Sequence, residues 1–179
     1  MSKMNTKVLT TTKMLTTLGL LLATEIVLSR FLSISAWNFK IGFSFVPVVL
    51  AAMLYGWWGA AAVAGLGDFL GATLFPIGPY FPGFTLTAAL TGCIFGLLLY
   101  REKSVLNRVL SALIAVWITQ FVLSLLLNTY WIHVLYGSPF MELLATRALQ
   151  AVLMSVTQFV TIVFALYPLT DRLKGVVTA

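Results

Sequence analysis

Charged side chains are scarce in this chain. Of its 179 residues, only 9% are Asp, Glu, Lys or Arg, whereas 60% are hydrophobic and the mean hydropathy is +1.01. A soluble domain carries charge on roughly a quarter of its residues. The low charge therefore excludes an ordinary soluble fold. Together with the long apolar stretches, it predicts a single all-α domain that is an integral membrane protein.

Cysteine and histidine each occur once, as Cys93 and His133. A single cysteine excludes an internal disulfide and a cysteine-based metal cluster, and a single histidine excludes a multi-histidine metal site. The sequence also lacks the GxxxxGK[ST] loop of ATP-binding proteins and the HExxH and Ser-x-x-Lys patterns of hydrolases. We therefore predict no metal, no cofactor and no catalytic residue.

The stretch GLGD at 65–68 matches the Gly-x-Gly-Asp pattern of intramembrane aspartyl proteases. Those enzymes need two carboxylates that share a proton. The only other aspartate in the sequence is Asp171, at the far end of the last apolar stretch. This distance argues against a protease. Nucleic acid is not expected as a partner either, because the net charge of +6 forms no basic face with interleaved aromatic residues.

The positions of the basic residues predict the topology. If the three basic clusters all face the cytoplasm, an even number of spans must separate them. Turn-forming stretches at 33–44, 55–59 and 76–83 then favour six spans with both termini cytoplasmic. A secretory signal in residues 1–36 is the competing interpretation, but its cleavage would leave an odd number of spans. The basic clusters are Lys3, Lys7 and Lys13; Arg101, Lys103 and Arg108; and Arg172 and Lys174. The predicted spans are 13–33, 45–55, 58–75, 83–100, 108–130 and 140–168.

Six ionisable residues remain away from the predicted cytoplasmic ends, and all but Glu25 fall near the outer side: Glu25, Arg30, Lys40, Asp68, Glu142 and Arg147. An ionised side chain at a helix centre in the membrane costs about 2.5–3.5 kcal/mol on insertion scales. Internal pairing, of Asp68 with Arg147 or of Glu25 with Arg30, would offset this cost. A polar cavity open to the outside would offset it as well.

Aromatic residues lie close to these charges. An interfacial aromatic belt is the simplest explanation for many of them. It does not explain the prolines and glycines at 76–83, which form a fixed non-helical loop beside Asp68. Such a loop is typical of a site for a flat polar ligand. The aromatic residues are Trp37, Tyr80, Phe81, Phe84, Tyr130 and Trp131.

Gly19 and Ala23, in the stretch GLLLA, form a small-xxx-small surface in the first predicted span. Such a surface lets another helix approach closely. That helix could belong to a partner subunit or to this chain itself.

Three stretches of the sequence resemble the substrate-specific (S) components of energy-coupling factor (ECF) vitamin transporters, and more narrowly the folate-specific ones. They are KIGFSFVPVVLAAMLYG (40–56), GDFLGATLFPIGPYFPGFTLTAALTG (67–92) and LLNTYWIHVLYG (126–137), with Arg147 following. The resemblance implies a six-helix, multi-pass subunit in a bacterial plasma membrane that is not itself an enzyme. It also implies an outward-facing folate site, and a complex with a membrane coupling subunit and two ATPase subunits. In that family a small-xxx-small motif on the first helix, usually Ala-x-x-x-Ala, docks on the coupling subunit. Gly19 and Ala23 stand at these positions, and glycine at the first is a departure that still permits close helix contact.

Folate also suits the residues chemically. The 2-amino group and N3–H of its pterin ring are adjacent donors that one carboxylate, Asp68, can accept together. Aromatic rings can stack on the flat ring, and cations can bind the two carboxylates of the glutamate tail. A different vitamin such as riboflavin or thiamine, an intramembrane enzyme, and an assembly protein are the alternatives. The predicted substrate-binding residues are Arg30, Lys40, Asp68, Tyr80, Phe81, Asn128, Trp131 and Arg147.

Overall fold

The computed structural model describes residues 2–35, 40–100 and 104–177. Helix α1 (Ser2–Arg30) leads into a short antiparallel pair of strands in which Ile34 faces Ile41 and Ser35 faces Lys40. Two further helices follow, and the C-terminal half then forms two long helical columns, each with a π-helical section. The remaining elements are β1 (Ile34–Ser35), β2 (Lys40–Ile41), α2 (Phe45–Leu74), α3 (Pro82–Leu99), α4 (Val105–Trp117), η1 (Ile118–Leu127), α5 (Asn128–Tyr136), α6 (Phe140–Thr161), η2 (Ile162–Leu166) and α7 (Tyr167–Val177).

Within the described residues, five helical stretches are long and apolar enough to cross a membrane. This agrees with the predicted helical membrane fold, apart from the two short strands. The predicted spans at 45–55 and 58–75 fall within one element, α2. The stretches are Thr11–Arg30, Phe45–Leu74, Pro82–Leu99, Val105–Tyr136 and Phe140–Leu173.

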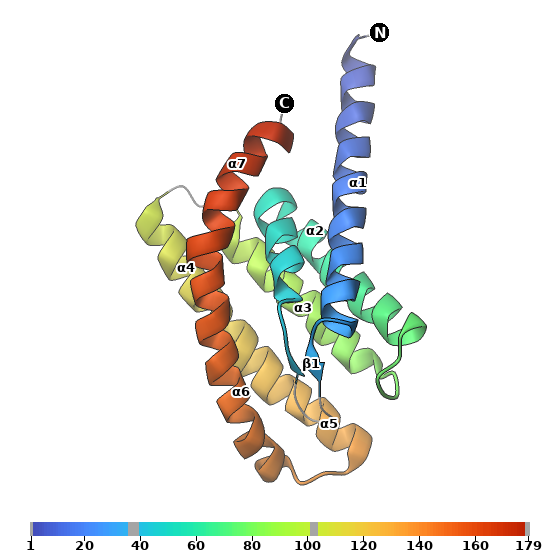
Figure 1. The fold of residues 1–179 in the computed structure, drawn as a ribbon, viewed down its shortest axis with the longest axis vertical. Coiled ribbons are helices and arrows are strands. Elements are labelled where there is room, and N and C mark those ends of the chain that lie inside the picture. Colours follow the sequence, from blue (N-terminus) through green and yellow to red (C-terminus); the bar gives the residue numbers. More distant parts are fainter. Residues whose placement is uncertain (1, 36–39, 101–103, 178–179) are drawn as a thin grey trace.

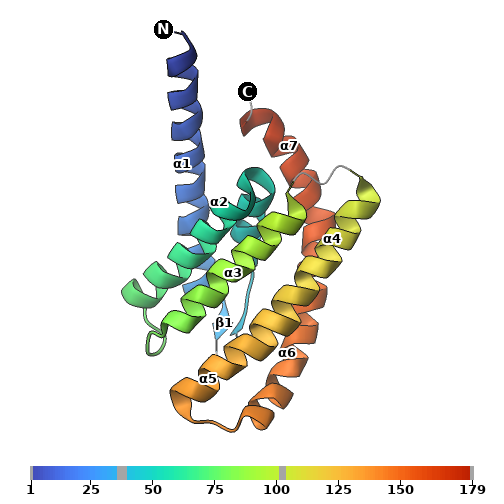
Figure 2. The same cartoon turned by 180° about the vertical axis from the view of Figure 1, so that it is seen from behind.

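Helix α2 changes direction at Gly56. The backbone there has φ 76° and ψ −161°, outside the helical region and in a range that favours glycine. Beyond this point α2 runs alongside α3 with very little space between the two backbones, since a Cβ on Gly92 would lie only 2.4 Å from the carbonyl oxygen of Ala60. Figures 1 and 2 show the two helices side by side.

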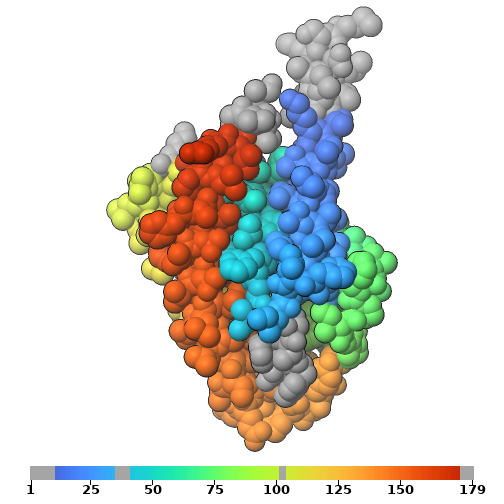
Figure 3. Space-filling model, viewed as in Figure 1, coloured from blue at the N-terminus to red at the C-terminus, as the bar shows by residue number. Residues whose placement is uncertain are grey.

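The first part of α2, before Gly56, lies at the centre of the hydrophobic core. Val49, Ala51 and Ala52 are fully buried, and they belong to one apolar cluster with residues of α3, α4 and the last column. Figure 3 shows the surface of this region (cyan) between α1 (blue) and the α6–α7 column (orange to red). This segment therefore connects the N-terminal and C-terminal halves of the molecule.

Helix α1 begins and α7 ends at one end of the molecule, and the α2–α3 and α5–α6 loops lie at the other (Figures 1 and 2). At the first end, Arg108 of α4 donates two hydrogen bonds to the carboxylate of Asp171 in α7, at 2.6 and 3.0 Å. The hydroxyl of Tyr167 also donates to the carbonyl oxygen of Arg108. Asp171 thus pairs with an arginine, and does not form the carboxylate pair with Asp68 that a protease would need.

Candidate ligand-binding site

A cavity of about 570 Å³ lies between α2, α3, the η1–α5 column and α6, next to the α2–α3 loop. Its volume is within the range of about 300–1,000 Å³ usual for small-molecule sites. Its walls combine charged, amide and aromatic side chains. They include Arg30, Ser44, Phe45, Asp68, Tyr80, Phe81, Phe84, Thr87, Thr91, Gln120, Ser124, Asn128, Tyr136, Arg147, Gln150, Met154 and Gln158.

Six of the eight residues predicted to bind substrate line this cavity: Arg30, Asp68, Tyr80, Phe81, Asn128 and Arg147. They come from α1, α2, the α2–α3 loop, α5 and α6, so residues far apart in the sequence meet in one place. Trp131 does not line the cavity. The backbone of Lys40 belongs to β2, but its side chain lies outside the described residues.

Asp68 is held from two sides. Its Oδ1 lies 3.5 Å from Nη2 of Arg30, and its Oδ2 accepts a hydrogen bond from the hydroxyl of Thr85 at 2.8 Å. Nη2 of Arg30 also donates to the backbone carbonyl of Asp68 at 3.3 Å. Internal pairing was the alternative to a cavity, and the pair that the structure shows here, Arg30 with Asp68, was not among those considered. It forms because α1 packs on the second part of α2 and brings Arg30 directly to Asp68.

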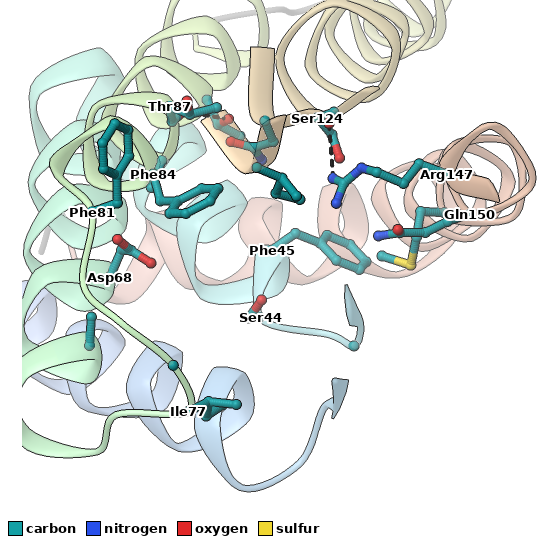
Figure 4. A pocket seen from close by; sticks show the side chains of 18 of the residues that line it. Ser44, Phe45, Asp68, Ile77, Phe81, Phe84, Thr87, Ser124, Arg147 and Gln150 are labelled. Atoms are coloured by element: carbon teal, nitrogen blue, oxygen red, sulfur yellow. Dashed lines mark hydrogen bonds between the residues drawn. The ribbon is translucent and has the colours of Figure 1, made fainter. Parts of the chain in front are cut away.

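Arg147 projects into the cavity from α6 and is only 7% exposed. Its Nη2 donates to the carbonyl oxygen of Ser124 at 3.0 Å, which connects α6 to η1. Figure 4 shows Arg147 and Gln150 on one side of the pocket and Asp68, beside Phe81 and Phe84, on the other. The cavity therefore has a cationic side and a side with a carboxylate, with aromatic rings nearby.

Uncharged amides make up much of the polar wall, and three of them were not among the predicted residues: Gln120, Gln150 and Gln158. The spacing of polar residues in the sequence could have predicted one of these, Gln120. Gln120, Ser124 and Asn128 recur every four residues, so they share one face of a column that is otherwise mostly apolar. The π-helical section η1 carries part of this face, and π-helical turns are frequent at functional sites.

Trp131 supports the wall from behind. Its ring centroid lies 5.6 Å from that of Phe81, which does line the cavity. Its Nε1 donates to the hydroxyl of Thr87 at 3.0 Å, and that hydroxyl donates to the carbonyl oxygen of Gly83. Trp131 thus fixes α3 against α5 and holds Phe81 in the cavity wall.

Gly19 and Ala23 are exposed on α1. A Cβ on Gly19 would meet no atom within 4 Å, so at this position the described part of the chain supplies no helix to pack against it. Of the two interpretations of this surface, contact with the chain's own helices therefore has no support at Gly19.

Comparisons with known proteins agree on one family. Residues 13–175 match the family described as "ECF transporter, substrate-specific component". The chain is 35% identical over 157 residues to the folate transporter FolT of Clostridium novyi (strain NT), covering 88% of this chain and 89% of that protein. It is 31% identical over 126 residues to the folate transporter FolT of Leuconostoc mesenteroides subsp. mesenteroides, covering 70% and 66%.

A solved structure is similar as well. The crystal structure of FolT bound with folic acid matches with a TM-score of 0.77 at 30% sequence identity, covering 86% of this chain and 90% of that one. The family match extends over nearly the whole length of the five candidate spans, from α1 to α7. This chain therefore belongs to the substrate-specific components of ECF transporters.

Proposed function

We propose that this chain binds folate at the outer face of a bacterial plasma membrane and delivers it to an ATP-driven ECF transporter. The observation that carries the proposal is the cavity of about 570 Å³, with Arg147 on one side and Asp68 on the other, in a fold similar to FolT bound with folic acid. Folate has a flat ring rich in hydrogen-bond groups and an anionic tail, so both halves of the ligand have suitable partners.

The predicted residues then have distinct roles. Arg147 attracts the tail carboxylates, because a guanidinium can bind a carboxylate through two parallel hydrogen bonds. Asp68 and Asn128 offer oxygen atoms to donors on the pterin ring. Tyr80 and Phe81 cover its flat faces. Arg30 neutralises Asp68 and adds positive charge to the same wall, and we keep Lys40 as a further candidate cation near the entrance.

The proposed topology has six helical segments, with Gly56 dividing α2 into two. Both termini then lie in the cytoplasm, and the α2–α3 loop lies outside. Basic residues of the three clusters that the structure describes, among them Arg108 of α4 and Arg172 of α7, lie toward the α1–α7 end, and the positive-inside rule then supports this orientation. A membrane coupling subunit would dock at Gly19 and Ala23, and two ATPase subunits would supply the energy for import.

A binding titration tests the proposal. The purified chain in detergent is titrated with folic acid, riboflavin and thiamine, and its five tryptophans report binding by fluorescence. We expect saturable binding of folic acid and a marked loss of affinity in Asp68→Asn. Glu142→Gln is the matched control, because Glu142 is exposed and does not line the cavity. Preferential binding of riboflavin or thiamine would overturn the folate assignment.

A further inference from the structure

A second compartment of about 210 Å³ continues the main cavity. The two share much of their walls, since Asp68, Gln120, Asn128 and Gln158 line both. The second compartment then extends to Glu25, Phe95 and Thr119, which do not line the main cavity. It is therefore a polar extension of the ligand site rather than a separate pocket.

This compartment lies deeper in the helix bundle. Arg147 lines only the main cavity, whereas Gln158 lines both. The two residues are eleven positions apart on α6, which corresponds to about 16 Å along the helix axis. We propose that the ligand enters at the end of the molecule where the α5–α6 loop lies. Gln158 is farther from this loop than Arg147 is. An elongated ligand could thus place one end beside Arg147 and the other in the deep compartment.

Glu25 reaches the deep compartment because α2 has a glycine opposite it. The carboxylate oxygen Oε2 of Glu25 lies so close to Gly67 that a Cβ there would be 2.1 Å away. Any larger residue at 67 would displace the carboxylate. Glu25 is only 7% exposed, although it starts from α1, the helix with the least burial among the candidate spans. The close approach of Glu25 to Gly67 therefore brings a carboxylate from α1 into the second compartment.

The deep compartment also differs from the main cavity in charge. Its described lining residues include two carboxylates, Glu25 and Asp68, and neither lysine nor arginine. Gln158 is 5% exposed, and its Oε1 has no hydrogen-bond partner among the described residues. A buried acceptor is costly until a donor reaches it. This part of the site consequently favours N–H donors and disfavours carboxylates.

We infer that the deep compartment binds the N–H donor edge of the ligand ring, with Glu25 as a second carboxylate acceptor beside Asp68. The inference rests on the proposed function. In folic acid this edge is formed by the 2-amino group and N3–H, which together offer three N–H bonds. The ligand enters ring first, and its anionic tail stays at Arg147. Glu25 then distinguishes rings that carry an amino group at this edge from rings that lack it.

A comparison of two ligands and two proteins tests this role. The ligands are folic acid and its 2-desamino analogue, in which hydrogen replaces the amino group. We expect wild type to prefer folic acid by about ten-fold to a hundred-fold, as for a hydrogen bond to a charged group. In Glu25→Gln most of this preference should disappear, through weaker binding of folic acid. Affinities are measured by tryptophan fluorescence, and thermal unfolding confirms that each protein is folded.

Two further variants complete the experiment. Gly67→Ala keeps the Glu25 side chain but displaces its carboxylate, so it should lose the same preference even if Glu25→Gln folds poorly. Glu142→Gln, an exposed carboxylate on α6, should keep it. If the preference for folic acid is unchanged in both Glu25→Gln and Gly67→Ala, the role of Glu25 is overturned while folate binding stands. A wild-type chain that binds no folic acid instead overturns the proposed function.

Discussion

Arg147 is the buried cation that defines one side of the cavity. It is 7% exposed and already bonded to the carbonyl oxygen of Ser124, so its guanidinium is held in place before a ligand arrives. Guanidinium groups fixed in this way lose little freedom when they bind a carboxylate. We therefore propose that Arg147 binds the tail of the ligand.

Replacing Arg147 by glutamine should weaken folic acid binding by about ten-fold to a hundred-fold, because hydrogen bonds to charged groups contribute about 1.5–3 kcal/mol. 6-Hydroxymethylpterin has the same ring and no carboxylate, so its affinity should fall much less. Both affinities are measured by tryptophan fluorescence. Arg172→Gln, an exposed arginine near the other end of the last column, is the control. An equal loss for the two ligands would contradict the assignment of the tail.

Thr85 orients the Asp68 carboxylate through its 2.8 Å hydrogen bond to Oδ2. Thr85→Val keeps the shape of the side chain but removes this donor. We expect folic acid to bind about five-fold more weakly, corresponding to about 1 kcal/mol for one hydrogen bond. Thr73→Val is the matched control, because the Thr73 hydroxyl donates only to carbonyl oxygens of its own helix. Unchanged affinity in Thr85→Val would show that Arg30 alone is enough to orient Asp68.

For single residues, the sequence predicted which charged side chains line the cavity, but it did not predict which of them form ion pairs. Arg30, Asp68 and Arg147 were predictable because isolated charges in apolar helices need a polar environment. The pairing of Arg30 with Asp68 depends on the rotation of α1 against α2, which no composition reveals. Three glutamines that line the site were not predicted, because an uncharged amide costs less to bury than a charge and therefore does not by itself require a polar cavity.

The contact between α2 and α3 is close because glycine faces backbone. A Cβ on Gly92 would approach the carbonyl oxygen of Ala60 to 2.4 Å, and backbone atoms cannot move aside as a flexible side chain can. Gly92→Val should therefore destabilise the protein by more than the roughly 1–3 kcal/mol typical of overpacking. Thermal unfolding in detergent measures the change.

Gly19→Val is the matched control for that experiment. It places the same side chain in a helix, at a position where a Cβ meets nothing within 4 Å. Its unfolding temperature should stay close to that of wild type. Equal destabilisation by the two substitutions would mean that helix propensity, rather than the contact between α2 and α3, explains the effect.

Proline and glycine at 76–83 separate two helices in the structure. Helix α2 ends at Leu74 and α3 begins at Pro82, beside the span end at 75 and the span start at 83 that these residues suggested. The helical column that begins at Val105 continues to Tyr136, past the span end placed at 130. Asn128 lies within this column and lines the cavity, so its polarity serves the site and does not mark a helix end.

Considered as a whole, the molecule leaves α1 largely uncovered. Only 6% of the 18-residue apolar segment of α1 is buried, compared with 56% of the corresponding segment of α2. On this surface the exposed residues Gly19 and Ala23 offer a flat strip on which another helix can lie closely. The whole subunit could then be carried by a partner through this one helix, while the cavity stays at the opposite end.

Gly19→Leu combined with Ala23→Leu should separate the two activities of the molecule. The bulky side chains block close helix contact, so the coupling subunit and the ATPases that we propose as partners should no longer co-purify with the chain. Folic acid binding by the isolated chain should be unchanged, because neither residue lines the cavity. Ala145→Leu, an exposed alanine on α6, is the control and should retain the complex. Retention of the complex by the double variant would move the docking surface elsewhere.

The central position of the first α2 segment has a consequence for how the protein is made. Residues 45–55 span about 17 Å as a helix, compared with a hydrocarbon core of about 30 Å. Their packing partners include Ile162 and Leu166, and Met53 accepts a hydrogen bond from Thr170. During translation, this short helix is therefore synthesised long before the C-terminal residues that pack around it. We expect chains truncated before Phe140, the start of the last helical column, to remain incompletely folded in the bilayer and to be degraded by membrane quality-control proteases.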